Sequence, residues 1–131
     1  MGKDCSCKVF FSENFLSLLS ILVAPLKDSY VVVMVTASNK QEAEKITQKL
    51  LEEKLIACAN ILGPVSSHFH WAGKIDKAEE YLLFMKSRSD LFDAVSAKVK
   101  TLHSYEVPEV LALPILKGSK AYLDWLNGVL K

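Results

Sequence analysis

The sequence predicts an α+β domain with a split β-α-β plan. Two units follow one another along the chain, and each combines an apolar strand pattern, an amphipathic helix and a second strand pattern. An extended hairpin joins the units, and another helical pattern closes the chain. Because each crossover should be right-handed, we expect both main helices on one face of an antiparallel sheet. The opposite face then needs a cover, from the last helix and from neighbouring subunits.

The first unit begins with a β-branched run over residues 30–36, which is typical of a strand buried on both faces. Ser38 and Gln41 have capping-box spacing, which predicts the start of a helix. A second strand is expected over 55–62, ended by a turn at Gly63-Pro64. The helix has an apolar face of Ala43, Ile46 and Leu50 and a solvated face of Glu42, Glu44, Lys45, Lys49, Glu52 and Glu53.

The second unit repeats this order after an extended segment over 65–71 and a reversal at Ala72-Gly73. The remaining strands are expected over 79–87 and 110–116. Ser89 is predicted to cap the second main helix and Ser119 the last one. The second main helix carries Leu91, Val95, Val99 and Leu102 at helical spacing, and the last helix carries Tyr122, Trp125, Leu126 and Val129 on one side.

Length and composition describe one globular domain of 131 residues with a net charge of +1. Its basic and acidic residues are interspersed, so no basic stripe indicates nucleic-acid binding. The odd count of three cysteines favours reduced thiols and a cytoplasmic protein.

Residues 1–29 are expected to form an N-terminal extension that is either weakly structured or a packed helix. Its apolar run over 15–26 is shorter than the ~20 residues of a membrane span. The domain proper is expected over 30–131.

Histidines supply the candidate metal ligands. His68 and His70 alternate along a predicted strand, so their side chains should point to the same side and can share a metal ion. His103 follows a helix, where the helix dipole favours an imidazolium. The motif after His103 adds the phenol of Tyr105 and the carboxylates of Glu106 and Glu109. These groups could bind a cation or a polar small molecule.

Two further residues are candidates for a binding cleft. Trp71 either packs on the core or forms the wall of a pocket with its indole N–H free to donate. Lys86 ends an apolar strand pattern and needs a carboxylate partner if its ammonium points inward. This partner can be Glu106, Glu109 or a residue of a neighbouring subunit. No nucleophile with an adjacent base and no glycine-rich phosphate loop is evident, so the sequence does not indicate an enzyme.

From about residue 30 to residue 130 the chain resembles the CutA divalent-cation tolerance family. The motifs that carry the resemblance are Thr36, Leu55-Ile56-Ala57-Cys58-Ala59-Asn60, Phe69-His70-Trp71-Ala72-Gly73-Lys74-Ile75, Lys86-Ser87-Arg88, His103-Ser104-Tyr105-Glu106-Val107-Pro108-Glu109 and Tyr122-Leu123-Asp124-Trp125-Leu126. The resemblance implies a ferredoxin-like split β-α-β sandwich with an extended hairpin and a C-terminal helix. It also implies a homotrimer joined by edge strands and a link to tolerance of copper or other divalent metals.

The chain departs from the family's copper-binding pattern at three positions. Val35 replaces a cysteine at the end of the first strand, Leu102 replaces the first of two histidines, and Ser104 replaces a proline. His103 is therefore the single metal ligand that the resemblance carries over. Two functions remain open. One is a trimeric metal-binding tolerance protein that uses His103, or His68 and His70, for Cu²⁺ or another divalent cation. The other is a trimer resembling PII-type signalling proteins, with small-molecule sites between subunits lined by Trp71, Lys86, Tyr105, Glu106 and Glu109.

Overall fold

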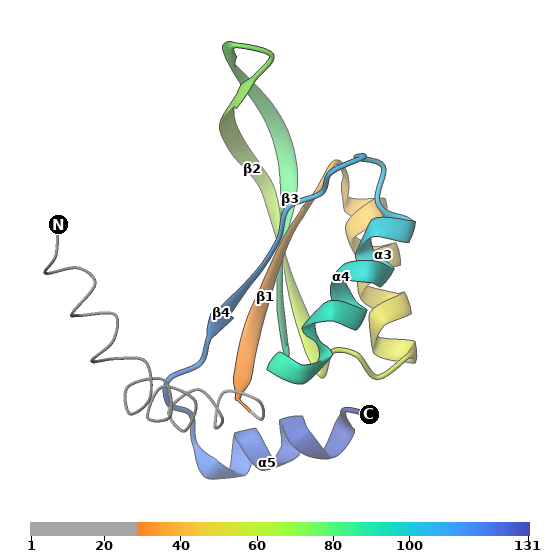
Figure 1. Cartoon of the computed structure of the whole chain (residues 1–131), viewed down its shortest axis with the longest axis vertical. Helices are drawn as coiled ribbons and strands as arrows, with labels where there is room; N and C mark the ends of the chain where they lie inside the picture. Colours follow the sequence, from red (N-terminus) through yellow and green to blue (C-terminus); the bar gives the residue numbers. More distant parts are fainter. Residues whose placement is uncertain (1–28) are drawn as a thin grey trace, which may run out of the picture.

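The computed structural model describes residues 29–131, so the extension predicted over 1–29 lies almost entirely outside the described residues. The elements follow one another in the order expected (Figure 1). They are β1 (Tyr30–Ala37), α3 (Lys40–Glu52), β2 (Cys58–Trp71), β3 (Lys74–Arg88), the 3₁₀ helix η2 (Ser89–Leu91), α4 (Phe92–Leu102), β4 (Val110–Pro114) and α5 (Lys120–Val129).

The four strands form one antiparallel sheet in the order β2-β3-β1-β4. Figure 1 shows α3 and α4 side by side on one face of this sheet, as right-handed crossovers require. The hairpin of β2 and β3 projects beyond the body, and α5 crosses the end of the sheet opposite to the hairpin tip. The predicted ferredoxin-like α+β fold is confirmed.

The core lies between the sheet and the two main helices. Alternate residues of β1, from Val31 to Ala37, are buried, while the residues between them are only half-buried. The prediction that this strand is buried on both faces is therefore wrong for a single chain, because helices cover one face only. The helix side chains that fill the core include the predicted Ala43, Ile46, Leu50, Leu91, Val95 and Val99.

The predicted chain turn at Gly63-Pro64 is wrong. β2 runs through these residues as one long strand, and a register shift lies between Leu62, which faces Leu82, and Val65, which faces Glu80. A Cβ atom on Gly63 would lie 2.4 Å from Tyr81 Cδ2, so glycine is needed for close packing on that ring. The reversal at Ala72-Gly73 is confirmed, and both residues have a positive φ.

Several element ends also differ from the predictions. The side chain of Asn39, not of Ser38, caps α3 by accepting a hydrogen bond from the backbone N–H of Glu42 at 2.8 Å. Ser89 begins a 3₁₀ turn instead of capping α4 directly, whereas Ser119 caps α5 as predicted. The strand boundaries shift as well: β2 begins at Cys58 instead of 55, β3 begins at Lys74 instead of 79, and β4 ends at Pro114 instead of 116. Across residues 29–131, none of the helices has both the length and the hydropathy to cross a bilayer.

Candidate functional site

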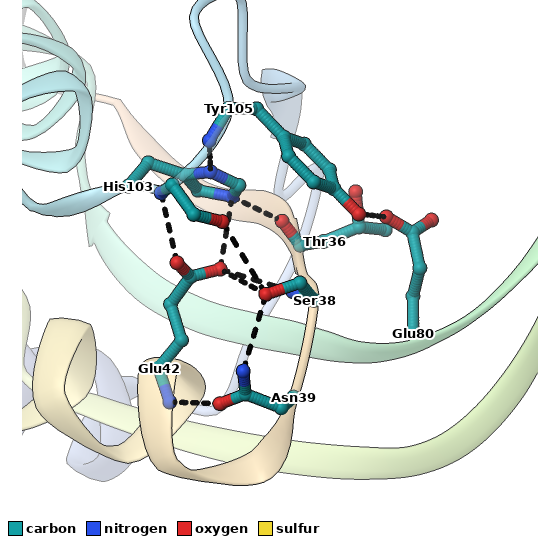
Figure 2. A network of polar contacts seen from close by, with 8 residues as sticks. Thr36, Ser38, Asn39, Glu42, Glu80, His103 and Tyr105 are labelled. Carbon is teal, nitrogen blue, oxygen red and sulfur yellow. Dashed lines mark hydrogen bonds and ion pairs between the residues drawn. The ribbon is translucent and has the colours of Figure 1, made fainter.

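The predicted motif forms the connection between α4 and β4. α4 ends because its C-cap, His103, takes an extended conformation, with φ −84° and ψ 144°. Pro108 cannot donate a backbone hydrogen bond, and it disfavours helix at the residue before it. The connection therefore passes over the end of β1 as an irregular loop, and Figure 2 shows its first side chains among residues of β1, α3 and β3. We call residues 103–109 the junction loop.

His103 uses both of its ring nitrogens inside the protein. Its Nε2 donates to the backbone oxygen of Thr36 at 2.6 Å, and its Nδ1 accepts from the backbone N–H of Tyr105 at 3.0 Å. These two partners assign the neutral tautomer with the proton on Nε2. The side chain is fully buried. A metal ion therefore reaches His103 only after one of these hydrogen bonds breaks.

Glu42 holds the junction loop against the start of α3. Its Oε2 accepts from the backbone N–H of Ser104 at 2.8 Å, and its Oε1 accepts from the backbone N–H of Ser38 at 3.0 Å. Burial acts to raise the pKa of this carboxyl, but hydrogen bonds from Ser38 and Ser104 outweigh burial and lower the pKa below its usual value. The prediction that Glu42 belongs to a solvated face is wrong.

Tyr105 ties the same loop to the sheet. Its hydroxyl donates to Glu80 Oε2 at 2.9 Å, and Glu80 is a buried carboxylate, 6% exposed. Burial and then the interaction with Glu80 raise the pKa of Tyr105 to about 12. The ring of Tyr105 also contacts the His103 ring, with centroids 4.7 Å apart. The Tyr105 hydroxyl and the Glu80 carboxylate are thus each other's hydrogen-bond partners.

The remaining cleft candidates lie apart in the single chain. Lys86 lies six residues along β3 from Glu80, about 20 Å at 3.3–3.4 Å per residue. Its ammonium donates to the side-chain oxygen of Asn60, so neither Glu106 nor Glu109 is its partner. Trp71 is 69% exposed at the tip of the hairpin, and Glu106 and Glu109 are exposed on the junction loop. One chain therefore does not bring the predicted cleft residues together.

His68 and His70 are exposed on the hairpin and on one side of it, as the alternation predicts. His68 Nε2 lies 3.1 Å from Ser66 Oγ. Lys77 faces His68 across the strands, and Ile75 faces His70. Within residues 29–131, three or more His, Cys, Asp or Glu side chains do not converge at any one point to hold a metal ion. The pair therefore offers at most two imidazole ligands from one chain.

Sequence reasoning missed two carboxylates, Glu42 and Glu80. A signal for Glu42 was present, because it lies three residues after Asn39, in the position from which a glutamate reaches back to the start of a helix. Glu80 precedes an apolar strand pattern and gives no comparable signal. Its burial follows from the position of Tyr105, twenty-five residues further along the chain.

A family model and several known proteins match the sequence. The family model described as CutA1 divalent ion tolerance protein matches residues 31–129. The "Divalent-cation tolerance protein CutA" of Archaeoglobus fulgidus is 45% identical over 95 residues, which are 72% of this chain and 92% of that protein. The rice "Protein CutA 1, chloroplastic" is 44% identical over 74% of this chain, but the match spans only 55% of the rice protein.

Solved structures agree with the sequence matches. The divalent cation tolerance protein Cut A1 from Thermus thermophilus superimposes with a TM-score of 0.77 at 38% identity, covering 78% of this chain and 99% of that one. CutA1 from Oryza sativa gives the same TM-score at 40% identity, with 81% and 97% covered. Fold, motif order and identity point the same way, and the chain belongs to the CutA1 divalent ion tolerance protein family.

Proposed function

We propose that the protein is a homotrimeric, non-catalytic tolerance protein of the cytoplasm that binds Cu²⁺ or another divalent cation. The observation that carries the proposal is the sheet face opposite α3 and α4, which is apolar and only partly covered. Three of its leucines are about half exposed: Leu62 at 45%, Leu111 at 53% and Leu113 at 48%. Exposed apolar surface of this kind marks a protein interface.

The cross-strand pairing shows that this surface is continuous. One row across all four strands consists of Asn60, Phe84, Met34 and Leu111. The next row consists of Cys58, Lys86, Val32 and Leu113. The same side continues along the projecting hairpin as Val65, Phe69 and Trp71 of β2, which face Glu80, Asp76 and Lys74 of β3. We call these residues the open face. A two-stranded arm beyond the body has no core of its own, which supports packing against another copy.

The edges of the sheet support the same assembly. β2 and β4 are the outer strands, so each has backbone groups along one side that do not pair within the sheet. If β2 of one copy pairs with β4 of another, the open faces of the copies come into contact. The resemblance to the family supports three copies as the number we propose.

For the metal, the pair of His68 and His70 is the stronger candidate. Both imidazoles are exposed and lie on the side of the hairpin that is not part of the open face, so assembly leaves that side reachable. His103 remains the alternative, but it must give up a hydrogen bond to Thr36 or to Tyr105 before it binds a cation. Either site needs further ligands, from water or from a neighbouring copy.

Calorimetric titration with Cu²⁺ and Zn²⁺ tests the metal. We expect the double variant His68→Ala/His70→Ala to weaken binding at least tenfold, which corresponds to about 1.4 kcal/mol. His103→Ala should change binding little, and binding should weaken at acidic pH because protons compete for imidazole nitrogens. If the double variant binds as the parent does while His103→Ala binds tenfold more weakly, His103 is the ligand. If the parent binds no divalent cation below millimolar concentration, the metal proposal fails.

Light scattering tests the assembly. Leu111→Asp with Leu113→Asp introduces charge into the open face and should convert the trimer into smaller species. Leu51→Asp is the matched control, since Leu51 is 37% exposed on α3, on the other side of the sheet. A parent protein that is monomeric at micromolar concentration would contradict the proposal.

A second candidate function is the binding of a small molecule between subunits. Lys86 and Asn60 favour it, because they place an ammonium and an amide beside the apolar side chains of Phe84, Val32 and Leu113 on this face. Assembly would have to bring Trp71, Lys86, Tyr105, Glu106 and Glu109 together from different copies. Titration with nucleotides is the test: saturable binding that Lys86→Ala abolishes, without dissociating the trimer, would favour this function over metal tolerance.

A further inference from the structure

A surface groove lies on the helix side of the domain, where the end of α3, α4 and the end of the chain meet. Its volume is about 340 Å³, which falls within the roughly 300–1,000 Å³ of small-molecule sites in proteins. Because α3 and α4 cover the sheet face opposite to the open face, assembly through the open face leaves this side accessible (Figure 1). We call it the α4 groove, and its lining residues are Glu53, Leu55, Ala94, Ala97, Lys98, Thr101 and Lys131.

The floor of the α4 groove is apolar and fixed in position. Leu55 is 3% exposed and belongs to the core, and its backbone N–H donates to the backbone oxygen of Leu50 at 3.0 Å. Ala94 and Ala97 lie three residues apart on the same side of α4, and both are exposed. Since each of them presents only a methyl group, α4 leaves space beside Leu55 that a longer side chain would fill. An apolar body placed in this space is removed from water.

The rim of the groove is basic. Lys98 Nζ donates to Glu53 Oε2 at 2.6 Å. The backbone of Lys131 is held on both sides, because its N–H donates to the backbone oxygen of Lys54 at 3.0 Å and its own oxygen accepts from the Arg88 guanidinium at 2.9 Å. Across residues 29–131, the Lys131 ammonium does not form an ion pair. One ammonium of the rim is therefore shared with a carboxylate, and the other is available to a ligand.

Three ammonium groups act on the single carboxylate of this rim. The hydrogen bond from Lys98 holds the pKa of Glu53 below its usual value, and the charges of Lys131 and Lys49 lower this pKa further. The side chains that line the groove carry two positive charges and one negative charge, which leaves one positive charge in excess. A ligand with a single negative charge balances this excess, whereas Glu53 repels a dianion such as a phosphate ester more strongly.

We propose that the α4 groove binds a small organic monocarboxylate, with its carboxylate between Lys98 and Lys131 and its apolar body on the floor. The charge of the rim selects a monovalent anion, and the floor of Leu55, Ala94 and Ala97 selects an anion with an apolar part over a fully hydrated one. The site is separate from the open face and from the hairpin histidines, so it goes beyond the proposed metal binding and is tested independently of it.

NMR of the full-length protein with methyl-labelled alanine tests this site, because Ala94 and Ala97 carry reporters inside the groove. The probe is phenylacetate. Phenylacetamide supplies the same apolar body without charge, and phenyl phosphate supplies a dianion. We expect phenylacetate to shift the methyl signals of Ala94 and Ala97 saturably, with a dissociation constant of about 1 mM, and to leave the signal of Ala78 on the hairpin unchanged. The amide and the phosphate ester should bind at least about fivefold more weakly.

Two substitutions on the rim should change the affinity in opposite directions. Lys131→Ala should weaken phenylacetate binding about fivefold, whereas Glu53→Gln should strengthen it by about the same factor, because it releases the Lys98 ammonium from its carboxylate partner. Lys100→Ala is the matched control, since Lys100 is an exposed lysine of α4 outside the groove. Ala97→Leu should abolish binding by filling the floor, and circular dichroism checks that this variant keeps the helix content of the parent.

Several results would overturn the proposal. The first is the absence of a shift at Ala94 and Ala97 with phenylacetate up to about 10 mM. The second is phenylacetamide or phenyl phosphate binding as tightly as phenylacetate, because the groove then does not select a monocarboxylate. The third is an equal loss of affinity in Lys100→Ala and Lys131→Ala, since the anion then follows surface charge alone. An affinity that Glu53→Gln leaves unchanged or weakens would also contradict the assigned rim.

Discussion

Glu42 and Ser104, sixty-two residues apart in the sequence, are joined by a 2.8 Å hydrogen bond from the Ser104 backbone N–H to the Glu42 carboxylate. This contact fastens the junction loop to the first turn of α3. The same carboxylate accepts from Ser38, so one side chain connects the end of β1, the start of α3 and the loop after α4 (Figure 2). Glu42 therefore fixes the start of the junction loop, while Tyr105 fixes the loop to β3 through Glu80.

Glu42→Gln should destabilise the protein by about 1–3 kcal/mol, because an amide cannot accept at both of its terminal atoms and leaves a backbone donor without its partner. Urea unfolding at neutral pH measures this loss. Glu52→Gln is the control, since Glu52 is exposed on the same helix and its surface ion pair with Lys49 contributes at most about 1 kcal/mol.

The pH dependence of stability gives a second signature of Glu42. Its pKa is lowered in the folded protein, so the stabilisation is present above the ordinary carboxyl pKa and is lost as the pH falls through the folded value. The parent should therefore lose stability on acidification more steeply than Glu42→Gln. Parallel acid-unfolding curves for the two proteins would contradict this assignment.

Tyr105→Phe should cost about 1–3 kcal/mol, because it leaves the buried Glu80 carboxylate without the phenol. The raised pKa of Tyr105 predicts the alkaline behaviour of the parent: the stabilisation is complete below the ordinary tyrosine pKa of 10.0 and is lost as the pH rises towards about 12. Tyrosinate absorbance followed together with circular dichroism measures both effects. A parent tyrosine at this position that ionises near pH 10 without loss of structure would refute the contact.

Gly63→Ala should destabilise the hairpin by about 1–3 kcal/mol, since the added methyl group would overlap the Tyr81 ring. Gly128→Ala is the matched control. A Cβ there meets nothing within 4 Å, and within α5 alanine should stabilise by up to about 1 kcal/mol. Thermal unfolding of the two variants should therefore shift in opposite directions.

A chain that begins near Asp28 should keep its fold and its assembly. Among the described residues the core cluster runs from Val31 to Leu130, and Tyr30 is already paired with Arg88. Circular dichroism and light scattering of the truncated protein measure both properties. Insoluble protein, or a large fall in melting temperature, would show that residues 15–26 belong to the core or to the interface between copies.

The strands and helices could be predicted because periodicity depends on local residues. Ala43, Ile46 and Leu50 repeat at helical spacing, and they are buried as that spacing requires. The predicted turn at Gly63-Pro64 is wrong because glycine and proline occur in turns and in strand bulges alike. The pairing of β2 with β3 decides between the two, and it is not visible in the local sequence. Asn39 and Ser38 are both good caps, so the choice between neighbours depends on the backbone.

The candidate site was less predictable than the fold. Tyr105 was identified from its neighbours in sequence, but its partner Glu80 comes from another strand. The prediction of His103 as a metal ligand rests on its residue type, its position after a helix and the family resemblance. The hydrogen bonds that occupy its two nitrogens involve backbone groups of Thr36 and Tyr105, and backbone groups leave no trace in a side-chain pattern.

The register shift in β2 determines which side chains of the hairpin face which side. Between Leu62 and Val65 the strand advances by three residues while β3 moves by two, from Leu82 to Glu80. Even-numbered residues of β2 lie on the open face before this point, and odd-numbered residues lie there after it. The extra residue therefore shifts the alternation by one position. It places Phe69 and Trp71 on the side of the open face and places His68 and His70 on the other side. A strand without it would exchange the two sets, placing imidazoles where the copies are proposed to meet and leaving the indole outside.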